Sequence, residues 1–111
     1  MSEILKQFKC KNNMFLTMQH FGEIPTKATL IVHDSGGIIT VVSGIPLSHV
    51  YKVANDLCTV YVWNINIESR IGIGTTHSAD NPVLRVAHTN VSLSKETCAA
   101  FEDYLYDLMI R

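Results

Sequence analysis

The chain has 111 residues, the usual size of one domain, and we predict a single domain over residues 1–111. With 47% hydrophobic and 17% charged residues, it has too much apolar material for a disordered chain and a lighter charged surface than a typical domain. Its formal net charge of −1 comes from nine cationic and ten anionic residues scattered along the sequence, which argues against a nucleic-acid partner.

The first residues predict a short helix followed by a strand. Ile4, Leu5 and Phe8 share one face of a helix over residues 3–10. Residues 14–21 alternate weakly between apolar and polar side chains, and we expect them to form an outer strand.

The clearest local signal is a β-hairpin in the second quarter of the chain. Two β-branched runs, residues 28–33 and 38–42, flank a turn that contains Gly36 and Gly37. Because both faces of these runs carry aliphatic residues, we expect the two strands to lie centrally in the sheet and to be covered on both sides.

A second helix is predicted directly after the hairpin. Gly44 and Pro46 end the strand and begin this helix, since a proline at the first helical position loses no hydrogen bond. The apolar residues that repeat along one side of it are Leu47, Val50, Ala54 and Leu57.

The second half of the chain predicts three strands and a last helix. Residues 60–68 alternate with a period of two, residues 70–76 continue the apolar alternation, a loop follows over residues 77–82, and residues 83–89 form a further strand. Ser94 is the expected N-cap of the last helix. The apolar residues of this helix at helical spacing are Cys98, Phe101, Leu105 and Leu108.

These elements predict an α+β fold in the order α-β-β-β-α-β-β-β-α. Hairpin-connected strands with separate helices give an antiparallel β-sheet whose helices pack mainly on one face.

The cysteine content favours a reducing compartment. Cys10, Cys58 and Cys98 are odd in number and widely spaced, so we expect buried, reduced thiols and a cytoplasmic location. The first residues lack the apolar core of a signal peptide, and no run approaches the roughly 18 apolar residues of a membrane helix. We therefore predict neither export nor a membrane partner.

The histidines give no metal-binding pattern. No pair has the i, i+4 or i, i+2 spacing that places two imidazoles on one ion, so we predict no metal and no cofactor. The histidines are His20, His33, His49, His77 and His88. His33 with Asp34, and His77 with Asp80, come closest to a polar site, but both pairs lie at predicted turns where polar residues collect.

Other catalytic patterns are also missing. Gly72 and Gly74 lack the third glycine and the following helix of a dinucleotide-binding motif. Cys58 and Cys98 lie on predicted helices and are interpreted as packing residues, and no pair of carboxylates stands in apolar surroundings. We predict that the protein is not an enzyme.

Two features indicate protein contact. The first is the set of aromatic side chains with polar tips. Such side chains are favoured at interfaces, although core packing explains most of them equally well. The acidic residues of the last helix form a second cluster, for which a solvated helix face is the alternative. The predicted interaction surface comprises Tyr61, Trp63, Glu102, Asp103, Tyr106 and Asp107.

The chain resembles YbjN-like bacterial proteins and type III secretion chaperones. The similarity lies in residues 45–55 leading into a helix, in a strand pair within residues 60–86 and in residues 92–101 opening the last helix, and it covers residues 38–108. Asn55 corresponds to the asparagine that commonly ends the central helix in YbjN-like chains. The resemblance implies a non-enzymatic, often dimeric domain that binds a protein segment or modulates regulation. Secretion chaperones are usually more acidic, so a role in secretion is not implied.

Three functions remain open at this point. The first is a chaperone-like or regulatory adaptor that acts as a small homodimer. The second is an immunity or inhibitor protein that blocks a partner toxin or enzyme. The third is a small-molecule enzyme with an unrecognised polar site formed by His33, Asp34 or His77.

Overall fold

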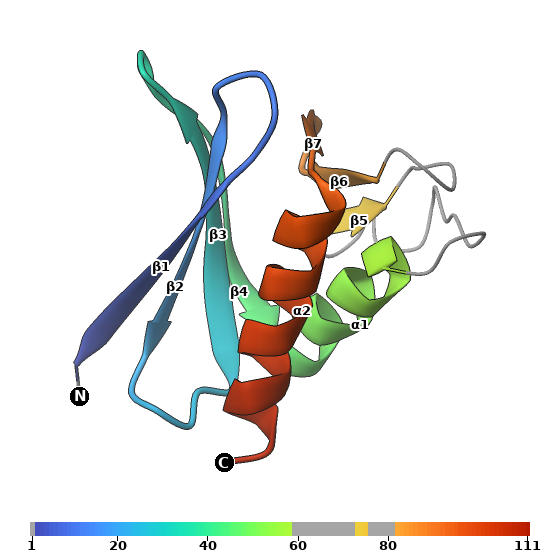
Figure 1. Cartoon of the computed structure of the whole chain (residues 1–111). Coiled ribbons are helices and arrows are strands. Elements are labelled where there is room, and N and C mark those ends of the chain that lie inside the picture. The colour runs from blue at the N-terminus through green and yellow to red at the C-terminus, as the bar shows by residue number, and fades with distance from the viewer. Residues whose placement is uncertain (1, 59–72, 76–81) are drawn as a thin grey trace.

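The computed structural model describes residues 2–58, 73–75 and 82–111. Over these ranges the chain forms seven strands and two helices, in the order β1 to β4, α1, β5 to β7, α2 (Figure 1). The predicted α+β class is confirmed. The predicted order is wrong at its first element, which is a strand, and the strands form two antiparallel sheets where one was expected.

The larger sheet contains the first four strands, hydrogen-bonded in chain order. Both helices lie on the same side of this sheet (Figure 1). Its strands are β1 (Glu3–Lys9), β2 (Phe15–Phe21), β3 (Lys27–Asp34) and β4 (Gly37–Pro46).

Strand β1 occupies the segment that was predicted to be the first helix. All seven of its residues face a residue of β2 in antiparallel register. Phe8 points inward and is buried, whereas Leu5 points to the opposite side and is exposed. The spacing of Ile4, Leu5 and Phe8 suits a helix, but the pairing with β2 satisfies the backbone and buries Phe8, so the strand is formed instead.

Strand β2 is an inner strand, not the predicted outer one, because β1 and β3 flank it. The β3–β4 hairpin is confirmed, and its turn is held by the carboxylate of Asp34, which accepts a hydrogen bond of 2.8 Å from the backbone N–H of Gly36. Of the two hairpin strands, which were both predicted to be central, only β3 is central. In the described part of the chain β4 is an edge strand, and the helices cover the sheet on one side only.

Helix α1 (Leu47–Cys58) begins one residue after Pro46. The backbone N–H of Leu47 donates to the carbonyl of Thr26, 2.9 Å away, which ties the start of the helix to the β2–β3 loop. The predicted apolar stripe is confirmed, and Val53 joins it. The buried residues of α1 are Leu47, Val50, Val53, Ala54 and Leu57.

The second sheet contains β5 (Ile73–Thr75), β6 (Val83–Val86) and β7 (Thr89–Ser92) in that order. The predicted strand over residues 83–89 is therefore two short strands. Ala87 makes the turn between them with φ of 55°, a conformation that ends a strand. The strand predicted over residues 60–68 lies outside the described residues, as does most of the predicted loop.

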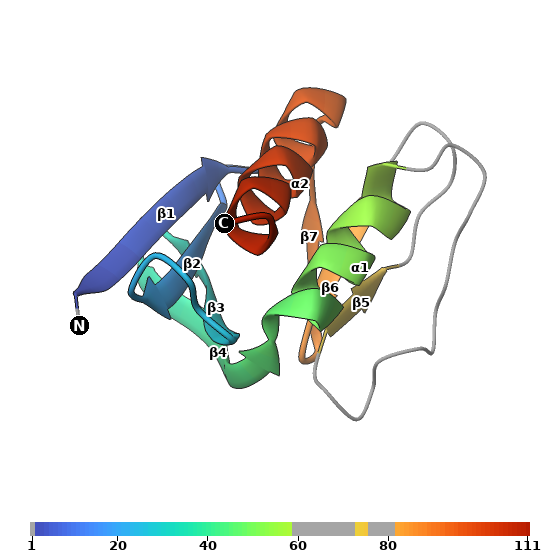
Figure 2. The ribbon, with the colours of Figure 1, turned by 90° about the horizontal axis from the view of Figure 1, so that it is seen from below.

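Helix α2 (Lys95–Met109) begins at Ser94, as predicted. The side-chain oxygen of Ser94 accepts a hydrogen bond of 3.1 Å from the backbone N–H of Thr97. The predicted stripe is confirmed, since Cys98, Phe101 and Leu105 are buried together with Leu108. Figure 2 shows α2 lying between the four-stranded sheet and β7, with α1 alongside.

The buried hydrophobic residues form one cluster to which both sheets and both helices contribute. Phe101 of α2 is fully buried, and the edge of its ring packs against Phe8 of β1 with the ring centroids 5.2 Å apart. The inner side of the four-stranded sheet is thus filled by helix side chains, which leaves its other side as the exposed one.

Candidate functional site

The acidic surface of α2 contains four of the six residues that the sequence indicated for protein contact. They are Glu102, Asp103, Tyr106 and Asp107. Asp103, Tyr106 and Asp107 are exposed, whereas Glu102 is half-buried. Tyr61 and Trp63, the other two, lie outside the described residues. The structure therefore brings the acidic residues together on one helix, as their spacing predicted.

Glu102 joins the two helices. Its Oε2 accepts a hydrogen bond of 2.5 Å from Nδ2 of Asn55 on α1. The rings of Tyr51 and Tyr106 lie 6.3 Å apart across the same helix pair. Part of this surface therefore holds α1 against α2, and Asp103 and Asp107 are the members that remain directed to solvent.

Cys58 ends α1 beside the carboxylate of Glu102, and part of its side chain is exposed. The prediction that this thiol is a buried packing residue is therefore wrong. Desolvation by its surroundings, followed by the negative charge of Glu102, raises the pKa of Cys58 from 9.0 to about 12. A thiol with this pKa is protonated at neutral pH and is a poor nucleophile.

The other two cysteines are buried and free, as predicted. Burial raises the pKa of Cys10 to about 11 and that of Cys98 to about 11. Both thiols act as small apolar side chains in the core.

His20 is the buried polar residue of the described core, with 1% of its surface exposed. Its Nδ1 lies 3.0 Å from the carbonyl oxygen of Gly22, and its Nε2 lies 2.6 Å from the hydroxyl of Tyr104 on α2. Burial raises the pKa of Tyr104, and Arg111 offsets part of this rise. Both ring nitrogens of His20 thus have a partner, and the contact of Nε2 with Tyr104 joins β2 to α2.

His33 and Asp34 are placed separately by the hairpin. The His33 ring stacks on Phe15 with the centroids 5.5 Å apart, and its Nε2 lies 2.8 Å from the hydroxyl oxygen of Thr17. Asp34 holds the turn through the backbone of Gly36. These contacts give both residues a role in the sheet, while His77 and Asp80 lie outside the described residues.

Within residues 2–58, 73–75 and 82–111, no group of three histidine, cysteine, aspartate or glutamate residues is arranged to hold a metal ion.

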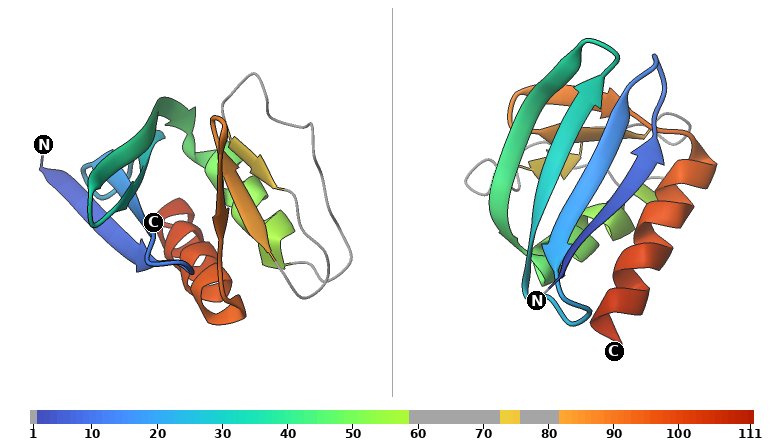
Figure 3. Two further views of the ribbon diagram at one scale, coloured as in Figure 1. Left: turned by 90° about the horizontal axis from the view of Figure 1, so that it is seen from above. Right: turned by 90° about the vertical axis from the view of Figure 1, so that its left-hand side faces the viewer.

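The outer face of the four-stranded sheet, which we define as the face turned away from α1 and α2, carries several exposed apolar side chains. The right-hand view of Figure 3 shows its strands with no other described element in front of them. Five of the nine large hydrophobic side chains that are exposed in the described part belong to this sheet. They are Leu5, Phe21, Ile38, Ile39 and Val41.

Sequence reasoning did not identify this face, although it found aliphatic residues on both sides of β3 and β4. That pattern was interpreted as a strand pair covered on both sides. The described chain covers only the inner side, so Val41 on β4 remains 47% exposed. An apolar pattern on both faces of an edge strand was the signal that pointed to this surface.

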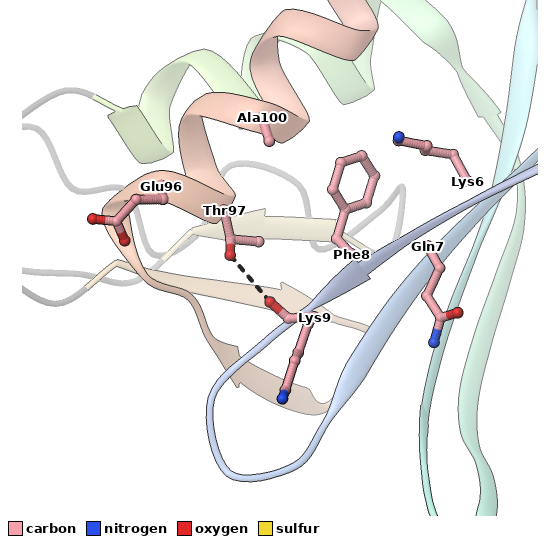
Figure 4. Close-up of a pocket in the computed structure, with 7 residues that line it drawn as sticks. All are labelled: Lys6, Gln7, Phe8, Lys9, Glu96, Thr97 and Ala100. Atoms are coloured by element: carbon pink, nitrogen blue, oxygen red, sulfur yellow. Dashed lines mark hydrogen bonds between the residues drawn. The ribbon is translucent and has the colours of Figure 1, made fainter.

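A surface hollow of about 360 Å³ lies between β1 and the first turn of α2 (Figure 4). The hydroxyl of Thr97 donates to the carbonyl of Lys9, 3.1 Å away, and closes one side of it. The Lys6 ammonium lies over the Phe8 ring, 5.8 Å from its centroid. The charged ends of Lys9 and Glu96 point in different directions in Figure 4, so they do not converge on one ligand.

A second hollow of about 350 Å³ lies at the loop between β2 and β3. Ile24 and Phe21 line it and are both exposed, which extends the apolar surface beyond the end of β2. The remaining lining residues are Pro25, Thr26 and Lys27.

No family model matches the chain, and comparison with curated proteins and with solved structures gives no match either. None of the helices in the described ranges is both long and apolar enough to cross a membrane.

Proposed function

We propose that the protein is a non-enzymatic protein-binding domain, a chaperone-like or regulatory adaptor that acts as a small homodimer. The observation that carries this proposal is the outer face of the four-stranded sheet. Apolar side chains that gather on one uncovered surface are typical of protein-binding sites.

The composition of this face suits a protein surface better than a small ligand. It is open and carries separate apolar side chains, among them Leu5, Phe21 and Val41, between polar neighbours such as Thr17 and Gln19. Ligand pockets are concave and enclose most of a small molecule, whereas protein interfaces are broad and mix apolar with polar area.

Affinity isolation with matched variants tests this proposal. Tagged chains are expressed in the source cells as wild type, as the outer-face variant Phe21→Ser and as the helix variant Asp103→Asn. We expect a stoichiometric protein with the wild type and with Asp103→Asn, and at least a tenfold loss with Phe21→Ser. Absence of any stoichiometric protein, including a second copy, would contradict the proposal.

The acidic surface of α2 supports a second candidate, an immunity or inhibitor protein that blocks a basic partner. Asp103 and Asp107 are exposed one turn apart, where they repel each other in the free protein. A basic partner would relieve this repulsion and gain electrostatic attraction. In the same experiment, loss of the partner with Asp103→Asn but not with Phe21→Ser would favour this candidate.

A further inference from the structure

Three of the exposed apolar side chains of the four-stranded sheet, Ile38, Ile39 and Val41, lie on its edge strand β4, whereas Leu5 and Phe21 lie on β1 and β2. One row of paired residues runs across the strands from Gln7 through Thr17 and Ile31 to Val41. It begins with polar side chains on β1 and ends with aliphatic ones on β4. Along this row the side chains therefore become apolar toward the β4 edge.

A second row of paired residues shows the same trend. It runs from Lys9 through Phe15 and His33 to Ile38. A charge stands at the β1 edge, and an aliphatic side chain that is 69% exposed stands at the β4 edge.

The two edges of this sheet differ in how they are protected. Strand β1 carries Glu3, Lys6 and Lys9, and charged side chains on an edge strand oppose pairing with another chain. Strand β4 has ten residues and no charged side chain. No described strand pairs with its outer edge, and Thr40 and Val42, which face inward, are only half-buried. An edge of this kind is a template for a further strand.

We propose that β4 pairs with β4 of a second copy of this chain, in antiparallel orientation about a two-fold axis, and so forms an eight-stranded sheet. This inference rests on the homodimer of the proposed function and names the element that forms it. Ile38, Ile39 and Val41 of the two copies would then extend one apolar strip across the junction.

Charge favours a second copy over an unrelated strand. A two-fold axis places each residue of β4 near the same segment of the other copy, and a strand with charges would bring like charges together there. The uncharged sequence of residues 37–46 is compatible with its own copy. The net charge of −1 adds little repulsion between the two chains.

The expected dimer is weak. Gly44 has φ of 70°, and the register with β3 shifts between Ala28 and Leu30 and again between Val32 and His33, where Ile39 is an extra residue of β4. The regular open edge is therefore limited to residues 40–43. One strand pair and a few aliphatic side chains correspond to an interface below about 1,200 Å², which is the range of transient complexes. Dissociation constants near the micromolar range are therefore expected.

Sedimentation of the full chain from about 1 to about 200 µM tests the inference, because the dimer fraction follows concentration. The wild type should approach twice 12.4 kDa at the upper end. Val41→Lys places two ammonium groups at the junction and should weaken the dimer at least tenfold. Leu5→Lys, which changes a side chain of similar exposure on the opposite edge, should behave as the wild type.

Hydrogen exchange provides the second measurement. Amides of residues 40–43 that point away from β3 should exchange more slowly as the wild-type concentration rises, and this protection should disappear in Val41→Lys. Unchanged melting of both variants confirms that they fold.

Three outcomes would overturn the β4 pairing. Equal weakening by Leu5→Lys and Val41→Lys would indicate that outer faces stack. A dimer that persists in Val41→Lys would place the interface elsewhere and leave the homodimer intact. A wild type that stays monomeric at every concentration contradicts the homodimer as well, while affinity isolation still decides whether another protein binds.

Discussion

The imidazole of His20 and the hydroxyl of Tyr104 form a hydrogen bond of 2.6 Å that joins β2 to α2 inside the protein. The carbonyl oxygen of Gly22 can only accept, so Nδ1 of His20 carries the hydrogen. In the neutral imidazole, Nε2 then accepts from the Tyr104 hydroxyl. This arrangement satisfies a nearly inaccessible imidazole with one partner from its own loop and one from a helix 84 residues away.

Removal of the Tyr104 hydroxyl should destabilise the protein. Tyr104→Phe leaves Nε2 of His20 buried without a donor, and a buried unsatisfied polar atom costs about 1–3 kcal/mol. Tyr106→Phe is the matched control, because Tyr106 is 52% exposed, and its cost should stay within about 0.5 kcal/mol. Urea denaturation of the two variants measures the difference, and equal stabilities would show that the hydrogen bond contributes nothing.

Most of the stability that α2 gives the protein should come from its buried side chains. Phe101→Ala removes a fully buried ring that contacts Phe8, and such a change costs about 3–5 kcal/mol. Asp103→Asn on the exposed side should leave the melting temperature within a few degrees. Thermal melts monitored by circular dichroism distinguish them. If Phe101→Ala folds normally but loses self-association, the stripe would instead be a dimer interface.

The N-cap of α2 can be tested by loss and rescue. Ser94→Ala removes the acceptor for the backbone N–H of Thr97 and should cost about 1 kcal/mol. Ser94→Asp keeps a capping oxygen and adds a negative charge at the helix N-terminus, so it should retain wild-type stability. Chemical denaturation measures both variants, and an equal loss in Ser94→Asp would argue against capping.

Cys58 should react slowly despite its partial exposure. Because its pKa is raised from 9.0 to about 12, iodoacetamide at pH 8.5 should modify it at least about tenfold more slowly in the native protein than in urea. Glu102→Gln removes a negative charge next to the thiol and should speed the native reaction. Site-resolved mass spectrometry follows the modification. Equal native and unfolded rates would contradict the raised pKa.

The same thiol gives stability a defined pH dependence. Its folded pKa lies above its unfolded value, so the protonated form is favoured by folding. The contribution of the Cys58 thiol to the free energy of unfolding is present below pH 9. It is lost as the pH rises from about 9 toward about 12.

The sequence predicted elements correctly where one face of an element is clearly apolar. The repeat in α2 identified Phe101 and Leu105 as buried, and Ser94 as the cap, because helical spacing and capping are local properties. Strand β1 was mistaken for a helix because Phe8 is its one buried side chain. An edge strand with a single inward anchor has little periodicity, and its state depends on pairing with β2.

The candidate surfaces could be predicted only where they depend on local spacing in the sequence and not on the tertiary fold. Asp103 and Asp107 could be found because their spacing along a helix fixes their neighbours. The exposure of Val41 depends on whether another strand follows β4, which no local pattern contains. His20 alternates with the buried Leu16 and Met18 along β2, so its burial could have been recognised, whereas its partner on α2 comes from the tertiary fold.

The position of α2 between the layers also determines when the core can be completed during synthesis. Leu16 and Leu30 belong to the four-stranded sheet, whereas Phe101 and Leu105, which share their core, are translated after both sheets. The nascent chain therefore presents the inner side of its strands until α2 has been translated. Exposed strand surface in a partly made chain promotes aggregation. This protein should depend on ribosome-associated holdases more than its small size would suggest.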